Sequence, residues 1–422
     1  MTFCGLDFGT SNSTIGVSLK DRCQLVPLEG GKPTIRSAIF CDVEAKQWVF
    51  GQKGIDSYLE GVPGRLMMAL KTVLGSSLME DKTIIFNEFL PYTEVLSRFV
   101  QHLKKSAEQK LGAELSQVVL GRPVHFHDQD PSKDLLAQNT LEKIARNLGF
   151  KEVSFQYEPI AAALAYETTI PSEQLALIVD MGGGTSDFSI IRLRPQQKSA
   201  ERREDVLANC GIHIAGTDFD QRLSLKTVMP LLGMGSLMRG SSSDIEVPAM
   251  VYHDLTTWYT LSNLYGPASL AQVRSVQAMA FEKHLLTRLL SVLKHRAGHH
   301  ILDAVETTKQ RLSEVLEVFL NLAFIEDDLG VSIQRDLLNS VLAELFERIL
   351  DTVRQTIQEA GVQPSEINAI FYTGGSTKIP VIREKISALV PQATVVQGDA
   401  FGSVGLGLTI DAQRKYHRPF NN

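Results

Sequence analysis

Two segments of this 422-residue chain end an apolar run with an aspartate and follow it with a glycine-rich turn. They contain Asp7, Gly9, Thr10 and Ser11 in the first copy, and Asp180, Gly182, Gly183, Gly184, Thr185 and Asp187 in the second. Glycine lets a ligand approach the main chain closely, and successive exposed amide groups form an anion-binding concavity. Each aspartate could hold a hydrated magnesium ion, which takes few protein ligands. One such turn alone predicts a tight hairpin, but two copies about one domain apart predict a pair of phosphate loops.

Other common nucleotide-binding motifs are absent from the sequence. Gly31-Lys32 precedes Pro33 where a P-loop has serine or threonine, and the glycine spacing before it does not fit. No G-x-G-x-x-G follows an apolar strand and opens a helix, so a Rossmann dinucleotide site is not supported. Phosphate binding is therefore assigned to the two hairpins.

The elements that must position these turns follow from the spacing of apolar residues. Short apolar runs predict strands at 3–8, 14–19, 24–27, 38–41, 48–50, 117–120, 153–157, 175–179, 187–194 and 368–372. Helical periodicity predicts helices at 92–111, from 130 to about 149 and from 158, and 306–360 as nearly all helix. Strands alternating with helices indicate an α/β protein with mixed or parallel sheets.

Composition and charge narrow the class of protein. Hydrophobic residues make up 44% and charged residues 21%, as in globular proteins, and the formal net charge of −6 argues against a general nucleic-acid binder. The 4 cysteines, none paired as C-x-x-C, favour a reducing compartment. The N-terminus has no signal-peptide pattern, and no apolar run approaches the ~18 residues of a membrane span. We expect a cytoplasmic protein that binds neither nucleic acid nor membrane.

The two hairpins, with 374–380 (GGSTKIP), resemble the actin/hexokinase/heat-shock ATPase superfamily. Residues 158–163 (EPIAAA) and 211–223 (GIHIAGTDFDQRL) are similar to segments of the nucleotide-binding domain of DnaK-type 70-kDa heat-shock chaperones. Residues 155–159 and 229–235 are similar to short members of that group. The resemblance runs over roughly residues 2–410, apart from the region around 230–300.

The resemblance implies an actin-like ATPase fold, an α/β architecture of two duplicated lobes with ribonuclease H-like sheets and a nucleotide cleft between them. The lobes are expected at 1–172 and 173–410, with an insertion at about 230–300 and a C-terminal tail at 411–422. That tail resembles neither the linker nor the peptide-binding module of full-length chaperones, so no peptide-binding domain is expected.

The resemblance also carries roles onto matching positions. Lys71 matches the lysine that reaches the γ-phosphate, and Glu158 the carboxylate that orients water near the metal; Asp180 and Thr185 complete the implied catalytic set. The implied metal-binding residues, acting through water, are Asp7 and Asp180. The implied nucleotide-binding residues are Asp7, Gly9, Thr10, Ser11, Gly182, Gly183, Gly184, Gly216, Glu306, Lys309, Ser313, Gly374, Gly375, Ser376 and Lys378. The alternative for Lys71 is a solvated surface lysine. The alternative for Glu158 is a carboxylate that stands at a helix N-terminus only because the helix dipole favours it there.

The implied base and ribose site departs from the family pattern. Glu306, Lys309 and Ser313 fall one to two turns apart on one helix face, where they could bond a ribose and an adenine edge. The family places two arginines around the adenine, and Gln310 and Lys378 stand at those positions. An amide or ammonium stacks on a flat ring less well than a guanidinium does. Weaker adenine binding or a looser base preference follows, with an ordinary surface pair as the alternative for Glu306 and Lys309.

A weaker metal pattern is His295, His299 and Asp303, spaced i, i+4 and i+8 on one predicted helix. No fourth ligand is evident and Lys294 and Arg296 would repel a cation, so the pattern favours a solvated helix face over a metal site.

The leading hypothesis is an ATP-binding, slowly ATP-hydrolysing heat-shock-70-like protein that uses ATP/ADP and Mg2+. Its output is expected to be chaperone-related or a nucleotide-dependent interaction switch with a protein partner or client. A nucleotide exchange factor and a J-domain partner stay open, but residues 155–157 differ from the family near the co-chaperone surface and argue against regulation by a J-domain partner. The alternatives are a small-molecule kinase of the same superfamily, a non-hydrolysing nucleotide-binding scaffold and an ATP-dependent filament.

Overall fold

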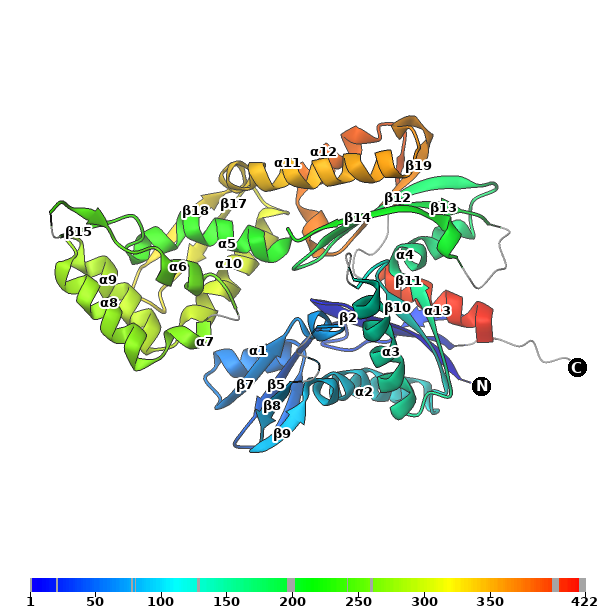
Figure 1. The fold of residues 1–422 in the computed structure, drawn as a ribbon, viewed down its shortest axis with the longest axis horizontal. Helices are drawn as coiled ribbons and strands as arrows, with labels where there is room; N and C mark the ends of the chain where they lie inside the picture. The colour runs from blue at the N-terminus through cyan, green and yellow to red at the C-terminus, as the bar shows by residue number, and fades with distance from the viewer. Residues whose placement is uncertain are drawn as a thin grey trace, which may run out of the picture. The chain divides into compact units, whose positions relative to one another are not determined.

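The computed structural model describes residues 2–19, 22–76, 79, 81–126, 130–195, 202–240, 242–258, 261–396 and 402–416 (Figure 1). The chain forms two compact units: Met1–Ile212 with Thr352–Thr377 and Ile386–Asn422, and His213–Asp351 with Lys378–Lys385. Within the described ranges, none of the helices has the length and apolar character needed to cross a membrane. The lobe boundaries proposed from the sequence stay a prediction, and positions 417–422 of the expected tail lie outside the described residues.

The first unit holds two sheets with the same topology. The first sheet has the order β11–β10–β1–β2–β3, formed by β1 (Phe3–Phe8), β2 (Asn12–Leu19), β3 (Arg22–Leu25), β10 (Gln117–Arg122) and β11 (Glu152–Tyr157), with β4 (Thr34–Arg36) paired to β2. The second has the order β14–β13–β12–β19–β20, formed by β12 (Gln174–Met181), β13 (Ser186–Leu193), β14 (Val206–Ile212), β19 (Ile367–Thr373) and β20 (Thr394–Val396). In each sheet three consecutive strands are antiparallel and two later strands add in parallel beside the first. The predicted duplication is thus confirmed for whole sheets.

Both glycine turns join the first two strands of their sheet, as predicted. Asp7 pairs with Thr14 across the first hairpin, and Asp180 pairs with Asp187 across the second. Both aspartates therefore occupy equivalent places at the end of a central strand whose other residues are mostly buried. The topology, rather than any local propensity, carries the two turns to corresponding edges of the two sheets.

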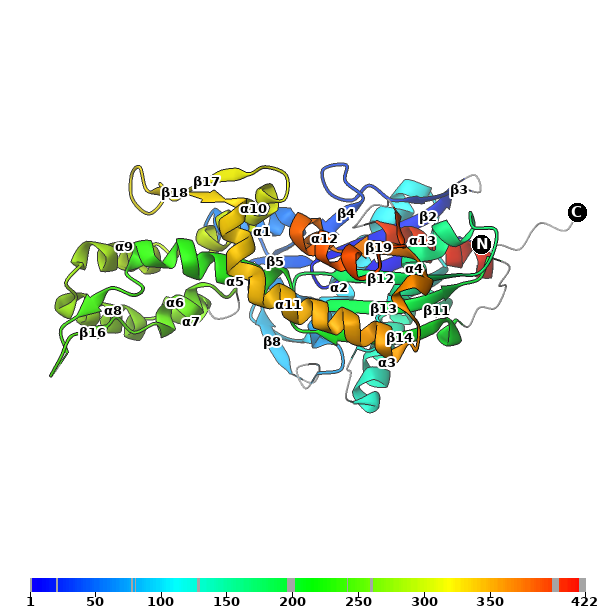
Figure 2. The same ribbon diagram turned by 90° about the horizontal axis from the view of Figure 1, so that it is seen from above.

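Helices α4 (Glu158–Glu167) and α13 (Ser403–Tyr416) pack against each other between the two sheets (Figures 1 and 2). The alanine run 161–163 of α4 is buried in the core that joins both sheets. Small residues let the backbones meet, because a Cβ on Gly407 would lie 1.8 Å from the carbonyl oxygen of Ala161. Helix α4 is therefore fixed closely between the two halves of this unit.

The outer face of the first sheet is covered by α2 (Tyr92–Leu111) and α3 (Pro131–Asn147). The predicted helix ends are confirmed: Gly112 ends α2 in the left-handed conformation (φ 69°), and the Asp130 carboxylate caps α3 by accepting from the Ser132 and Lys133 amides. On the second sheet, the Tyr372 hydroxyl lies 2.7 Å from that of Ser387 in α12 (Pro380–Leu389).

A smaller substructure of the first unit precedes α2. It consists of a three-stranded sheet, β6–β5–β7, a helix, a hairpin and a 3-10 turn. The elements are β5 (Ala38–Asp42), β6 (Gln47–Phe50), α1 (Gln52–Leu59), β7 (Gly64–Met68), η1 (Leu70–Val73), β8 (Lys82–Ile85) and β9 (Glu88–Pro91). The turn η1 carries Lys71.

The second unit is largely helical, with two hairpins. Its elements are α5 (Gly216–Thr227), η4 (Met229–Leu232), β15 (Leu237–Met238), β16 (Ile245–Glu246), α6 (Met250–Leu255), α7 (Leu261–Leu264), α8 (Pro267–Met279), α9 (Lys283–Lys294), α10 (Gly298–Leu312), β17 (Glu317–Asn321), β18 (Gly330–Gln334) and the first part of α11 (Arg335–Glu359).

Two predictions for this unit are wrong. The stretch 306–360 is not nearly all helix, because the β17–β18 hairpin interrupts it. Val318 and Leu320 are buried while their neighbours in β17 are exposed, which is the alternation of a strand. His295, His299 and Asp303 do not share a helix either, because α9 ends at Lys294 and Arg296 adopts a positive φ of 52°.

The close approach of α13 to α4 predicts a stability loss on substituting Gly407→Ala. Helix propensity alone would favour alanine by about 1 kcal/mol. The added Cβ, however, would collide with backbone of Ala161 that cannot rotate away, and overpacking typically costs about 1–3 kcal/mol or more. We expect a net decrease in the denaturant midpoint. Gly184→Ala, where a Cβ meets nothing within 4 Å, is the control; equal midpoints for both variants would contradict the packing.

Candidate functional site

Lys71 lies against Glu158, and both belong to segments that the fold brings together from far apart in the sequence. The Lys71 ammonium donates to Glu158 Oε1 at 2.7 Å, and each side chain is only 13% exposed. Lys71 follows Ala69, a non-glycine residue with a φ of 54°, so the chain turns sharply to present the lysine. Glu158 is the first residue of α4, where the helix dipole favours a carboxylate.

The two turn aspartates belong to the same electrostatic group. Burial raises the pKa of Asp7 to about 8, and the charge of Glu158 adds to that rise while Lys71 opposes it. Burial and the Glu158 charge likewise raise the pKa of Asp180 to about 6, against the effects of the Thr373 hydroxyl and Lys71. Burial would lower the pKa of Lys71, but its neighbouring carboxylates outweigh that effect and raise it.

The donor set fits a hydrated divalent cation. Three carboxylates, those of Asp7, Glu158 and Asp180, share one lysine, and burial together with the charge of Glu158 raises the pKa of both aspartates. In the described part of the chain, no three His, Cys, Asp or Glu side chains cluster closely enough to ligate a metal directly. Carboxylate oxygens are suitable partners for the water ligands of Mg2+, most of which the ion keeps when it binds a protein.

The glycine turns are held by serine hydroxyls from neighbouring segments. Ser37 Oγ donates to the Gly9 carbonyl at 2.7 Å, and Ser376 Oγ donates to the Gly182 carbonyl at 2.7 Å. These bonds occupy carbonyl oxygens that would otherwise repel an anion. The two turns also meet, since a Cβ on Gly183 would lie 2.3 Å from Ser11 Oγ.

The remaining predicted residues of the first unit lie at the same edge. Gly374 has a φ of 79°, and a Cβ there would lie 2.3 Å from the Met181 carbonyl oxygen and 2.9 Å from Asp180 Oδ1. Only glycine fits there, between the second turn and its aspartate. Thr185 is exposed at the tip of the second turn, and Thr10 is half-buried in the first. Gly184 and Gly375 complete the turns, and the roles of all these residues stay predictions.

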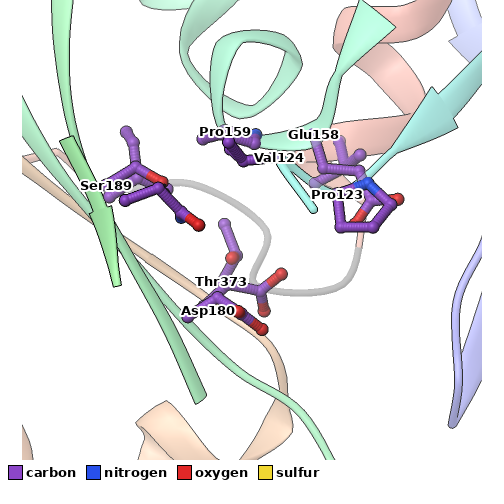
Figure 3. A pocket seen from close by; sticks show the side chains of 11 residues that line it. Pro123, Val124, Glu158, Pro159, Asp180, Ser189 and Thr373 are labelled. Carbon is purple, nitrogen blue, oxygen red and sulfur yellow. Dashed lines mark hydrogen bonds between the residues drawn. The ribbon is translucent and has the colours of Figure 1, made fainter. Parts of the chain in front are cut away.

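A small cavity lies beside Asp180 and Glu158 (Figure 3). Asp180 and Thr373 face Pro123 and Glu158 across it (Figure 3). Its volume of ≈ 30 Å³ is enough for about one or two water molecules. It is lined by Pro123, Val124, Glu158, Pro159, Ile178, Asp180, Asp187, Ser189, Asn209, Thr373 and Val404.

The sequence analysis missed most of these lining residues. Ser189 and Asn209 come from β13 and β14, where Asn209 Nδ2 donates to Ser189 Oγ at 2.8 Å. Their polarity inside strands is the one signal that could have marked them. Asp187, which pairs with Asp180 across the second hairpin, lines the same cavity.

The predicted base and ribose residues belong to the second unit. Lys309 is buried and donates to the Gly216 carbonyl at 2.9 Å and to Asp220 Oδ2 at 2.7 Å. The structure thus joins two predicted residues, Lys309 and Gly216, by a direct bond, and adds Asp220, which was not predicted, as a second acceptor for the lysine. Gln310 donates to Glu306 Oε1 at 3.0 Å, one turn away on the exposed face of α10.

Two further predicted residues lie at the ends of their elements. Ser313 caps the C-terminus of α10, with its hydroxyl 3.5 Å from the Lys309 carbonyl. Lys378 is exposed at the end of η6 (Gly375–Lys378), the turn that follows β19.

Comparisons with known proteins agree with this architecture. The family model described as Hsp70 protein matches residues 76–229 and 286–413. The chain is 24% identical over 431 residues to the "Chaperone protein HscA homolog" of Actinobacillus pleuropneumoniae serotype 5b (strain L20), covering 97% of this chain and 57% of that protein. The same figures of identity and coverage, over 433 residues, relate it to the "Chaperone protein HscA homolog" of Haemophilus influenzae (strain PittGG). The chain therefore spans little more than half the length of these curated relatives.

Two sheets of identical strand order, each with a glycine turn after its first strand, define the actin-like ATPase fold. The chain belongs to the Hsp70 family, whose model matches well over half of it.

The buried carboxylates predict a pH-dependent stability that Asp7→Asn should remove. The pKa of Asp7 is raised from 3.8 to about 8, so between these values the folded protein holds a proton that the unfolded chain releases. The free energy of unfolding should therefore fall as the pH rises through that range. Measured with a chelator and without nucleotide, Asp7→Asn should melt above wild type at about pH 8 and keep only a small part of that advantage near about pH 5.

The exposed aspartate Asp327, changed to asparagine, provides the control. A difference in melting temperature between Asp7→Asn and wild type that is the same at both pH values would contradict the electrostatic grouping.

Proposed function

We propose that the chain binds ATP and ADP with Mg2+ at the two glycine turns and hydrolyses ATP slowly. The observation that carries this proposal is the group formed by Asp7, Lys71, Glu158 and Asp180, which four separate segments bring to one edge of two duplicated sheets. A lysine held among carboxylates beside two glycine turns suits the positioning and charge stabilisation on which phosphoryl transfer depends.

Each residue of the candidate site has a distinct role in this proposal. The turn amides and the Thr10 and Thr185 hydroxyls hold the phosphates. Lys71 places its ammonium on the transferred phosphoryl group, where negative charge develops. Glu158 orients the lysine through their 2.7 Å bond and accepts a hydrogen bond from the attacking water, which the cavity beside it has room to admit.

Asp7 and Asp180 would hold Mg2+ through its water ligands. Bound there, the ion would neutralise phosphate charge and relieve the repulsion that raises the pKa of both aspartates. Asp187, next to Asp180 on the cavity, is positioned to accept a bond from a water of the same shell.

The base site in this proposal is formed by residues of the second unit. Glu306, Lys309, Ser313 and Lys378 would contact the ribose and adenine, with Lys309 fixed by Asp220. A conformation that binds ATP better than ADP would make the chain a switch, because a ligand shifts a protein toward the conformation it binds better. Its partner would be a protein, in keeping with the chaperone names of the relatives.

Lys71→Ala should abolish hydrolysis while leaving nucleotide binding measurable. Loss of one such contact costs on the order of 3 kcal/mol in the barrier, or roughly a hundredfold or more in rate. The loss of rate is measured by single-turnover hydrolysis of magnesium-ATP with the wild type and the variant. The exposed Lys53→Ala should hydrolyse as wild type does. Nucleotide binding without hydrolysis in wild type would favour the non-hydrolysing scaffold. ADP release that depends on an added acceptor would favour a small-molecule kinase.

Gln310→Arg combined with Lys378→Arg should raise the preference for adenine. A guanidinium stacks on a purine better than an amide or an ammonium does, and cation–π contacts are worth about 0.5–2 kcal/mol each. We expect a several-fold tighter ADP dissociation constant and a wider gap between ADP and GDP in calorimetry. Gln355→Arg is a matched control, because Gln355 bonds Glu359 one turn away as Gln310 bonds Glu306. Unchanged base preference would remove these positions from the base site.

A further inference from the structure

A buried cluster of charged residues lies at the opposite end of α4 from Glu158. Glu167, the last residue of α4, receives two bonds from the Arg202 guanidinium, at 2.6 and 3.0 Å. Arg202 also donates to Asp205, which pairs with Arg194 in turn. The side chains of Arg202, Glu167 and Asp205 are 3%, 1% and 0% exposed.

Further contacts tie this cluster to three parts of the first unit. The backbone amide of Arg194, just after β13, donates to Glu167 Oε1 at 2.8 Å. Arg414 of α13 approaches Glu167 Oε2 to 3.6 Å. Arg202 directly precedes the 3-10 turn η3 (Arg203–Asp205), which Asp205 ends and which leads into β14. Helix α4 is thereby fastened at its C-terminus to the second sheet and to α13.

Burying these charges is costly, and the cost points to a positional role. Removing a charge from water is unfavourable unless its partners are well placed, and a well-packed apolar pair is often at least as stable. The cluster is thus weak evidence for stability as such. The cluster instead orients the segments that it joins, because a two-pronged guanidinium–carboxylate pair fixes both the distance and the angle between its partners.

The fastened helix links the cluster to the candidate site. Helix α4 has 10 residues, about 15 Å at 1.5 Å per residue, with Glu158 at one end and Glu167 at the other. Ala161, Ala162 and Ala163 between them are buried against both sheets, so the helix cannot easily bend. A shift of Glu167 would therefore move Glu158 relative to Lys71 and Asp180.

We propose that Glu167 and Arg202 are positioning residues, which set the place of Glu158 against Lys71 from the far end of α4. The proposal rests on the proposed function for its effect on hydrolysis, but not for its effect on the Lys71–Glu158 pair itself. Since a displacement of about 1 Å can cost up to a hundredfold in rate, weakening the cluster should be visible at the site.

The test compares Glu167→Gln with Glu108→Gln. Glu108 is a matched control, because it pairs with a cation, Lys104, and accepts a backbone amide bond from Leu115 at 2.9 Å, as Glu167 does from Arg194. Two quantities are measured: the single-turnover rate with magnesium-ATP, and the rate at which an amine-reactive reagent modifies Lys71 without nucleotide, read by mass spectrometry. Arg202→Lys, which keeps the charge and loses the two-pronged bond, is the milder second variant if Glu167→Gln does not fold.

We expect Glu167→Gln to lower the hydrolysis rate about tenfold and to raise Lys71 modification several-fold, with Arg202→Lys intermediate and Glu108→Gln at wild-type values. Wild-type values in both assays for Glu167→Gln or Arg202→Lys would overturn the proposal. An equal rise in Lys71 modification for Glu108→Gln would overturn it too, since general loosening would then suffice. A wild type that does not hydrolyse ATP would refute the proposed hydrolysis alone, and the Lys71 modification rates would still decide the positioning role.

Discussion

The pair between Lys71 and Glu158 is the interaction on which the rest of the site depends. One buried ammonium faces three carboxylates, and burial together with the charge of Glu158 raises the pKa of Asp7 and Asp180. Without the lysine, three carboxylates in so little water would carry a large desolvation penalty. With it, the group is held together but left short of positive charge. A site in that state favours a divalent cation and its polyanionic ligand.

The fold supplies this arrangement by duplication. Each sheet ends its first strand in an aspartate and a glycine turn, and packing both sheets on α4 and α13 brings the two turns to one edge. The close approaches at Gly374 and Gly407 leave no room for a Cβ, so the geometry is fixed by backbone contacts as much as by side chains. The ionic cluster around Glu167 lies at the other end of the same helix, where it holds α4 against the second sheet.

Much of the fold could be predicted from the sequence, because its main signals are local. The duplicated glycine turns, the end of α2 at Gly112 and the cap of α3 at Asp130 each depend on a few neighbouring residues. The strands β17 and β18 were missed because their alternation is short and lies between two long helices. Strands β4 and β7 pair with partners distant in sequence, so local patterns do not reveal them.

In the candidate site, too, residues in local motifs were predictable and residues that depend on distant partners were not. Asp7 and Asp180 were found from their turns, and Lys71 and Glu158 from resemblance, but their shared burial follows only from the assembled sheets. The roles of Asp220, Asn209 and Glu167 could not be predicted, since each side chain bonds a partner far along the chain. The measurement that tests the account most directly is calorimetric titration of ADP with and without Mg2+, in wild type and in Asp7→Asn/Asp180→Asn. The account predicts that Mg2+ tightens ADP binding in wild type and has no effect in the double variant. Equal enhancement by Mg2+ in both proteins, or no ADP binding by wild type, would contradict it.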